Sequence, residues 1–326
     1  MKSSIHFVVP ASFARELSEL PDQALGQNFP YWFAGRYNWV AQSWMVLRQY
    51  REGLTIGTTP KAGVMNFSHV MGWRENNTRN GEFRISVRAD YRRMFDVDFE
   101  ILQNSTVKTG SRQAYLPYWP VPGLIARNPD RIGLKTLAYA GLIGPLNLAN
   151  ELRAADDRLN AYDFRVIEPH LWHDLSEIDA LVAIRSFDTK THDAKPPSKL
   201  FSAWLAGVPL IAGYDSAFSS VGRPGVDYIR VKSEAEFHEA LARLASDPKY
   251  YASFVDAGKA RAAEVSHDAI AKIWLECIDT QITPAFEKWQ AEGDAPLRGY
   301  LARTADGMRT TASRAKRALR AVKGRS

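Results

Sequence analysis

Cysteine is almost absent from this sequence, since Cys277 is the only one among 326 residues. No internal disulfide can form and a cysteine-rich metal site is excluded, which suits a reducing cytoplasm. Long apolar runs are lacking as well. The opening stretch "MKSSIHFVVPASFARE" has an apolar run of only about five residues before its proline, too short for a signal peptide or a membrane span. We therefore expect a cytoplasmic protein.

An excess of positive charge is absent everywhere except at the C-terminal end. The whole chain carries +6, from 42 Lys or Arg against 36 Asp or Glu. Residues 297–326 hold nine Lys or Arg and one acid, Asp306, so this segment carries +8 and residues 1–296 carry −2. A nucleic-acid-binding body is therefore not expected, and the basic segment needs its own explanation.

Apolar residues recur at spacings of three or four through residues 297–326, with Lys and Arg between them. This pattern predicts a basic amphipathic helix, which suits the anionic inner face of the cell membrane. A disordered basic tail is the alternative interpretation.

Strand and helix patterns alternate along the rest of the chain. Strands are predicted at "IHFVVP", "GVMNFSHVM", "FRISVRAD", "DFEILQN", "LKTLAYAGLIGP", "YDFRVIEP", "EIDALVAIRS", "VPLIAG" and "VDYIRVKS". Helices are predicted at "YWFAGRYNWVAQSWMVLRQYREGL", "NLANELRAADDRLNA", residues 198–206 and "EAEFHEALARLASD". Such alternation is typical of an α/β fold with a parallel sheet covered by helices on both sides.

A proline-rich connector at residues 117–131 divides the chain. Its four prolines favour an extended, stiff segment rather than a regular element. We predict two Rossmann-like domains facing each other across a cleft, and a basic helical tail. The predicted limits are 1–122 for the first domain, 123–278 for the second, 279–296 for a helix crossing back, and 297–326 for the tail.

Chemistry-bearing residues follow the strands predicted for the second domain, where open α/β sheets bind their ligands. They are Gly141, Gly144, Arg185, Lys195, Ser198, Lys199, Tyr214 and Asp215. A helix N-terminus attracts anions through its free N–H groups and its dipole, and Arg and Lys add charge-assisted hydrogen bonds. The first six residues therefore predict a diphosphate site, and Tyr214 and Asp215 are candidates for contact with the nucleoside or the sugar. The alternative is that the lysines are solvated and Ser198 merely caps the helix.

Residues 131–290 resemble the donor-binding half of a GT-B fold glycosyltransferase of the bacterial group 1-like kind. The resemblance rests on "LAYAGLIGPLNLANEL", "IDALVAIRS", "KPPSKLFSAWLAGVPLIAG", "GVDYIRV" and "VSHDAIAKIW". It implies that the helix before "GVPLIAG" presents its N-terminus to the diphosphate of a nucleotide sugar, which is a substrate, so no cofactor is expected.

The sequence departs from the family at one point. Many retaining members carry two glutamates about eight residues apart, whereas "YDSAFSSVGRPGVD" contains none. Asp215, Ser219 or Ser220 would then replace a glutamate at the ribose. Whether the reaction inverts or retains the anomeric configuration stays open.

Other residues are candidates for base recognition and for catalysis. His170 and Trp172 follow a predicted strand and suit contact with a nucleoside, although packing is the alternative for Trp172. A base acting on the acceptor hydroxyl is expected from the first domain. His69 and Asp90 are the candidates, against a structural role for the histidine and capping of "YRRMF" by the aspartate.

The pair Asp96 and Asp98 resembles the metal-binding motif of the other large glycosyltransferase fold. Phe95, Val97 and Phe99 alternate with these aspartates, so ordinary strand patterning predicts that the aspartates face water. We therefore expect no metal site.

The sequence favours a metal-independent glycosyltransferase that moves a sugar from a nucleotide-diphosphate sugar to a glycan or lipid-linked acceptor. Two alternatives are a catalytically silent, sugar-nucleotide-binding or membrane-tethered scaffold, and a GT-B-type sugar-nucleotide epimerase. The epimerase requires more acids and histidines in the cleft.

Overall fold

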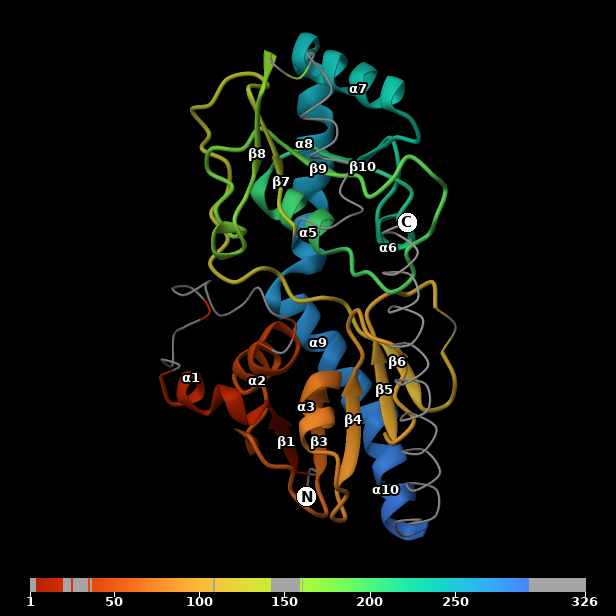
Figure 1. Ribbon diagram of the computed structural model, residues 1–326. Coiled ribbons are helices and arrows are strands. Elements are labelled where there is room, and N and C mark those ends of the chain that lie inside the picture. The colour runs from red at the N-terminus through yellow and green to blue at the C-terminus, as the bar shows by residue number, and fades with distance from the viewer. Residues whose placement is uncertain are drawn as a thin grey trace, which may run out of the picture.

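The strands of the protein form two separate parallel sheets, each in its own half of a two-lobed molecule (Figure 1). The computed structural model describes residues 4–19, 37–107, 109–141 and 161–292, together with the single positions 25, 35 and 159. The predicted α/β class with two sheets is confirmed.

The first sheet has the order β2-β1-β3-β4-β5-β6, with every neighbouring pair parallel. Its strands are β1 (Ile5–Val8), β2 (Leu54–Gly57), β3 (Met65–His69), β4 (Phe83–Val87), β5 (Phe99–Leu102) and β6 (Gln113–Tyr115). Phe83 packs on Phe286 of α10 (Thr283–Glu292), while the next residue, Arg84, stacks on Trp73 of α3 (Val70–Glu75). Because successive strand residues point to opposite faces, helices cover both sides of the sheet.

The second sheet has the order β11-β10-β9-β7-β8, again parallel throughout. Its strands are β7 (Thr136–Tyr139), β8 (Asp163–Val166), β9 (Ala180–Ala183), β10 (Leu210–Ala212) and β11 (Ile229–Arg230). Helices α5 (Ser198–Ala206), α6 (Ser216–Val221), α7 (Glu234–Ser246) and α8 (Pro248–Ala262) belong to this half. The chain leaves β7 toward β8 on one side and reaches β9 on the other.

A line of helices returns the chain from the second half to the first (Figure 1). After α8 come α9 (His267–Cys277), the π-helical turn η8 (Ile278–Ile282) and α10. Trp274 of α9 is fully buried, with its ring 5.4 Å from Trp119 and 6.4 Å from Trp39. The contact already joins α9 to the first half, near α2 (Gln42–Leu47). The domain limits at residues 122 and 278 stay predictions.

Most described elements occur where the sequence patterns predict them, and α5 has the predicted bounds. The predicted long helix near residue 40 contains the π-helical segment η4 (Tyr37–Ala41) followed by α2. Strands β2 and β6 were not predicted. The predicted helix at "NLANELRAADDRLNA" and the tail at 297–326 lie outside the described residues. No helix in the described ranges is long and apolar enough to cross a bilayer.

Candidate active site

The candidate site lies at the carboxyl ends of β7 and β9. The strand order diverges between these two strands, and such a switch point is where open α/β sheets form their ligand crevice. Lys199 of α5 lies over the ring of Tyr139, the last residue of β7, with its Nζ 5.4 Å from the ring centroid. Gly141 follows, and a Cβ atom there would come within 2.6–2.9 Å of the Tyr139 ring and hydroxyl. Glycine therefore leaves room for the ring that supports Lys199.

The first turn of α5 has backbone amides that no described residue occupies. Pro197 occupies the N-cap position and gives no side-chain cap, while its carbonyl accepts from the amides of Leu200 and Phe201 at 3.0 and 3.1 Å. Ser198 is thus the first helical residue rather than the cap. Within the described residues, the amides of Ser198 and Lys199 have no hydrogen-bond acceptor, so they remain available to an anion.

Two cations stand beside this helix start. Lys199 is half-buried and forms no ion pair with any described residue. Burial, followed by the positive charge of Arg185, lowers the pKa of Lys199 to about 8. The Nε atom of Arg185 donates to Asp215 Oδ2 at 3.1 Å. This geometry leaves the Nη atoms of Arg185 without another partner in the part of the chain that the structure describes.

Asp215 holds Arg185 and also organises the next helix. Its Oδ1 accepts from the amide of Ala217 at 3.1 Å, which caps α6. Burial raises the pKa of the Asp215 carboxyl, and the Arg185 guanidinium opposes this rise. Because its oxygens are engaged inside the protein, Asp215 positions Arg185 rather than facing a ligand itself.

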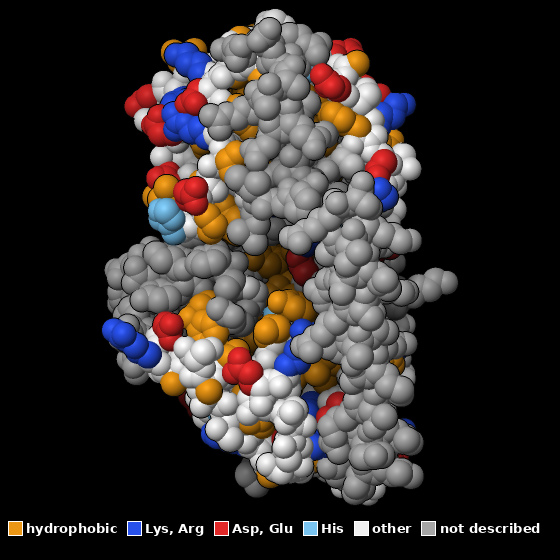
Figure 2. Space-filling view, in the orientation of Figure 1, with side chains coloured by type: hydrophobic (Ala, Val, Ile, Leu, Met, Phe, Trp, Pro, Cys, Tyr) orange, Lys and Arg blue, Asp and Glu red, His pale blue; other side chains and the backbone are white. Residues whose placement is uncertain are grey.

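A cleft of about 520 Å³, including space open to solvent, extends from this helix start toward the first half of the molecule. It is lined by Asn38, Tyr118 and Val121 from the first half, and by Ala140, Trp172, Leu175, Leu181, Ser198, Lys199 and Ser202. Figure 2 shows the hollow between the two lobes, with hydrophobic side chains on its floor. The lining is mostly apolar with a few polar groups, as is usual for small-molecule sites.

Asp90 and Lys195 meet across the boundary between the two halves. Lys195 Nζ forms an ion pair with Asp90 Oδ2, and Gln103 Nε2 donates to Asp90 Oδ1 at 3.1 Å. Residues 91–95 form no helix, so Asp90 is not a helix cap. The structure thus brings together one residue proposed as a catalytic base and one proposed to bind phosphate.

His69 lies at the carboxyl end of β3 and caps α3. Its Nδ1 accepts from the amide of Met71 at 3.2 Å, and its ring meets Tyr91 edge-on. A neutral imidazole that accepts at Nδ1 carries its proton at Nε2. In this arrangement Nε2 already carries a proton and cannot accept another from an acceptor hydroxyl, which favours Asp90 of the two candidate bases.

Of the remaining predicted site residues that the structure describes, only Trp172 is a lining residue of the cleft. Trp172 lines it, with its Nε1 donating to the carbonyl of Ile167 at 2.9 Å. His170, in η6 (Pro169–Leu171), is exposed and is not a lining residue. The Cζ atom of Arg230 lies over the Tyr214 ring, 4.4 Å from its centroid. Gly144 lies outside the described residues.

Sequence reasoning missed three residues near the site. Tyr139 ends a strand that was predicted, so its position was a usable signal. Ala89 and His192 have positive φ angles of 48° and 50°, an uncommon conformation for residues other than glycine. Burial and the charge of Arg185 lower the pKa of His192. Nothing in the sequence near either residue indicates that conformation.

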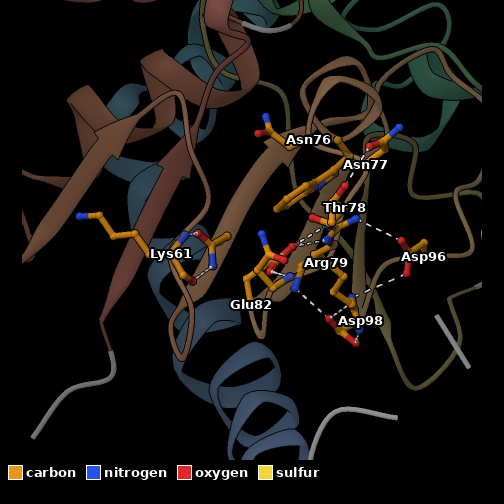
Figure 3. Close-up of polar contacts among 12 residues, drawn as sticks. Lys61, Asn76, Asn77, Thr78, Arg79, Glu82, Asp96 and Asp98 are labelled. Carbon is orange, nitrogen blue, oxygen red and sulfur yellow. Dashed lines mark hydrogen bonds and ion pairs between the residues drawn. The ribbon is translucent and has the colours of Figure 1, made fainter. Parts of the chain in front are cut away.

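The prediction that Asp96 and Asp98 face water is wrong. Both carboxylates are buried or nearly so and bind arginines (Figure 3). Arg84 Nη1 lies 3.1 Å from Asp96 Oδ2, and the Arg84 amide donates to Asp98 Oδ2 at 2.8 Å. β5 begins only at Phe99, so strand alternation does not apply to the two aspartates. Within the described ranges, no three or more His, Cys, Asp or Glu side chains lie together so that they could bind a metal ion.

Two facing parallel sheets, a cleft between their halves and a helix line that returns to the first half define the GT-B fold, as predicted. HepE of Anabaena in complex with UDP-glucose matches 85% of this chain and 100% of its own, with a TM-score of 0.51 and 10% identity. A glycosyltransferase from Rickettsia africae ESF-5 matches 86% of this chain and 99% of its own, with a TM-score of 0.50 and 9% sequence identity. TarM matches 72% of this chain, and the match covers 58% of the TarM chain, with a TM-score of 0.50 and 8% sequence identity.

These identities are low, so the likeness shows the shared fold. No protein-family model matches the sequence, and no curated protein matches it either.

Proposed function

We propose that the protein is a glycosyltransferase that uses a nucleotide-diphosphate sugar as donor. The observation that carries this proposal is Lys199, a half-buried cation without an acidic partner among the described residues, at the open start of α5. A buried charge is costly unless something pairs with it. Arg185 lies close enough for its charge to lower the pKa of Lys199, and two such cations at a helix N-terminus suit a diphosphate.

Each group has a defined task in this proposal. Sugar transfer breaks the bond between the anomeric carbon and the diphosphate oxygen, so negative charge develops on the leaving diphosphate. Lys199, Arg185 and the first amides of α5 stabilise that charge, which is the contribution that matters most in such reactions. The reaction then needs no metal ion. The apolar cleft, with Trp172 and Tyr118 on its walls, holds the nucleoside and limits water.

Fold likeness supports the choice of donor class. A protein of the same fold, HepE, is in complex with UDP-glucose, and another is a glycosyltransferase. The donor proposed for this chain is therefore a nucleotide sugar, either a hexosyl or a pentosyl donor. Lys199 is the one cation among the described residues that line the cleft, and the donor uses it, so an anionic sugar acceptor is disfavoured.

A panel of nucleoside diphosphates and their sugars tests the proposal. Ligand binding adds a free energy of RT ln(1 + L/Kd), where L is the free ligand concentration, to the stability of the folded protein and so raises the melting temperature, so even a weak donor is detected at high concentration. We expect one nucleotide to stabilise the protein, and the matching nucleotide sugar to release nucleoside diphosphate when an acceptor is added. If no nucleotide stabilises the chain, the proposal is wrong.

A silent nucleotide-sugar-binding protein is the second candidate. The specific observation in its favour is that no carboxylate lines the described cleft, and that Asp90 is engaged by Lys195. If the protein binds a nucleotide sugar but neither transfers the sugar to any acceptor tested nor hydrolyses the donor, this result supports the silent binding protein over the enzyme.

The acceptor is proposed to be a glycan carried on a membrane lipid. The support is the +8 charge of residues 297–326, since each basic residue near an anionic membrane adds to binding. Cosedimentation with vesicles of phosphatidylcholine alone and of phosphatidylcholine mixed with phosphatidylglycerol, an anionic lipid that gives the surface a negative potential, tests the membrane binding that such an acceptor requires. Full-length protein should bind only the anionic vesicles, and a chain ending at residue 296 should bind neither. Equal binding of both chains contradicts the proposal.

A further inference from the structure

We infer that Lys195 exchanges partners during the reaction. Without donor it pairs with Asp90, and with donor it moves to the diphosphate, which frees the Asp90 carboxylate to remove the proton of the acceptor hydroxyl. This inference rests on the proposed function and adds a coupling between donor binding and acceptor activation.

A strained backbone conformation orients Asp90, which suggests a functional reason for the direction of its side chain. Asp90 follows β4 at the carboxyl end of the first sheet. The residue before it, Ala89, is buried and has φ of +48°. A non-glycine residue in that region is strained, and strain of this kind is concentrated at functional sites. The bend at Ala89 turns Asp90 toward the second half, where it meets Lys195.

The Lys195 backbone is anchored separately from its side chain. Its amide donates to the carbonyl of His192 at 2.9 Å, and its carbonyl accepts from Asn104 Nδ2 at 3.3 Å. Gln103 Nε2 also donates to the carbonyl of Ala194 at 2.6 Å. The loop therefore stays attached to the first half when the Lys195 ammonium leaves Asp90.

The exchange is feasible because the pair is exposed. The side chains of Lys195 and Asp90 are 34% and 46% exposed, and ion pairs with this exposure are weak. A diphosphate carries more negative charge than one carboxylate. Lys195 is three residues from Ser198, the first residue of the open helix start, and its charge already lowers the pKa of Lys199. A short movement of a flexible side chain thus reaches the phosphate site.

The resulting step balances. The acceptor oxygen forms a bond to the anomeric carbon, the bond from that carbon to the diphosphate oxygen breaks with its electron pair, and the acceptor proton passes to Asp90. Lys195, Lys199 and Arg185 hold the charge that appears on the diphosphate. Asp90 is then a catalytic residue, and Lys195 both binds the donor and controls Asp90.

A simple structural bridge between the two halves is the competing explanation, and Asp90→Asn separates the two. The probe is the nucleoside diphosphate that the wild type binds most tightly among the uridine, adenosine, guanosine and thymidine diphosphates. Removing the competitor of the phosphate should tighten binding about two- to fivefold, the range of a weak exposed pair. The transfer rate should fall at least about 100-fold, as expected for loss of a general base.

Two further variants complete the test. Lys195→Met should weaken binding of the same probe, and more strongly in the Asp90→Asn background than in the wild type, because only there is Lys195 fully available. Asp188→Asn is the control, because it removes an acid from the loop that leads to Lys195. Asp188 binds Lys190 and Ser186, so its loss should change diphosphate binding less than Asp90→Asn does.

The outcomes are distinct. If Asp90→Asn binds the diphosphate as the wild type does or more weakly, or if Asp188→Asn tightens binding equally, the exchange is wrong while the proposed function stands. If the wild type binds none of the four diphosphates, the proposed function is wrong and the exchange fails with it.

Discussion

Lys199 is a residue whose position is difficult to explain by stability alone. It is half-buried over an aromatic ring, beside a second cation, and has no acidic partner among the described residues. Such a site lowers the stability of the folded protein, and proteins retain this kind of cost mainly where function requires it. Burial and the Arg185 charge, which lower the pKa of Lys199, are the physical causes of that cost.

The lowered pKa of Lys199, about 8 against 10.5 for a free lysine, predicts a pH dependence of diphosphate binding. Below pH 8 the ammonium is charged and attracts the diphosphate. As pH rises above 8 the free protein loses that charge, so affinity should fall by up to about tenfold per pH unit. Calorimetric titrations at pH 7, 8 and 9 measure this. Lys199→Arg keeps its charge throughout and should bind equally at pH 7 and 9.

Titration of Lys199 changes the free energy of unfolding in the opposite direction to the affinity for diphosphate. Between pH 8 and 10.5 the unfolded lysine binds more protons than the folded one, so this group makes folding more favourable as pH rises. A fall of affinity without a loss of stability over this range distinguishes titration of Lys199 from alkaline unfolding. An affinity that is flat with pH in the wild type contradicts the role of Lys199.

Some site residues could be predicted from the sequence because they lie beyond the end of a strand. Arg185 comes two residues after β9, and Lys199 lies in the first turn of α5, the next helix along the chain. The carboxyl edge of a parallel sheet collects such residues. The Asp90–Lys195 pair could not be predicted, because it joins residues 105 positions apart. The burial of Asp96 could not be predicted for a similar reason: its arginine partner Arg84 lies in β4, whereas Asp96 lies in the loop before β5.

At the scale of elements, the end of β7 and the start of α5 act as one unit. Tyr139 ends the strand, Gly141 leaves space for its ring, and the ring supports Lys199. The short apolar run of the strand and the proline pair before the helix made both elements predictable. β2 (Leu54–Gly57) and β6 (Gln113–Tyr115) are short and partly exposed, so their patterns were too weak to identify as strands.

Gly141→Ala should weaken diphosphate binding about tenfold while leaving the fold intact. The added Cβ would lie 2.6–2.9 Å from atoms of Tyr139, so the ring must turn away and Lys199 loses its support. Affinity and urea unfolding should both be measured. Gly110→Ala is the matched control, because its Cβ would meet only Gln113 Oε1 at an ordinary 3.6 Å. Equal affinity of both variants contradicts the unit formed by β7 and α5.

At the scale of the molecule, the two halves depend on α9 to form one cleft. Trp274 has no exposed surface, stacks on Trp119 and donates from Nε1 to the carbonyl of Pro117 at 3.4 Å. The proline-rich connector and the returning helix therefore meet at one aromatic cluster. That junction keeps Tyr118 and Val121 in place as one wall of the cleft.

Trp274→Ala should lower the free energy of unfolding by about 3–5 kcal/mol, the usual cost of removing a buried tryptophan. It should also weaken nucleotide binding, since the two cleft walls are no longer held together. Ile273→Ala on the same helix removes a side chain that is 42% exposed and should cost less than about 1 kcal/mol. Urea denaturation compares the two. Similar losses would show that α9 does not join the halves through Trp274.

The most direct measurement is a calorimetric titration of a nucleoside diphosphate into the wild type and Lys199→Met. We predict that at least one of the uridine, adenosine, guanosine and thymidine diphosphates binds the wild type. Its affinity should fall by about 10- to 100-fold in the variant, the worth of a charge-assisted hydrogen bond, with a melting temperature equal to or above that of the wild type. Binding that is unchanged in Lys199→Met, or absent from the wild type for all four diphosphates, would contradict a diphosphate site at the start of α5.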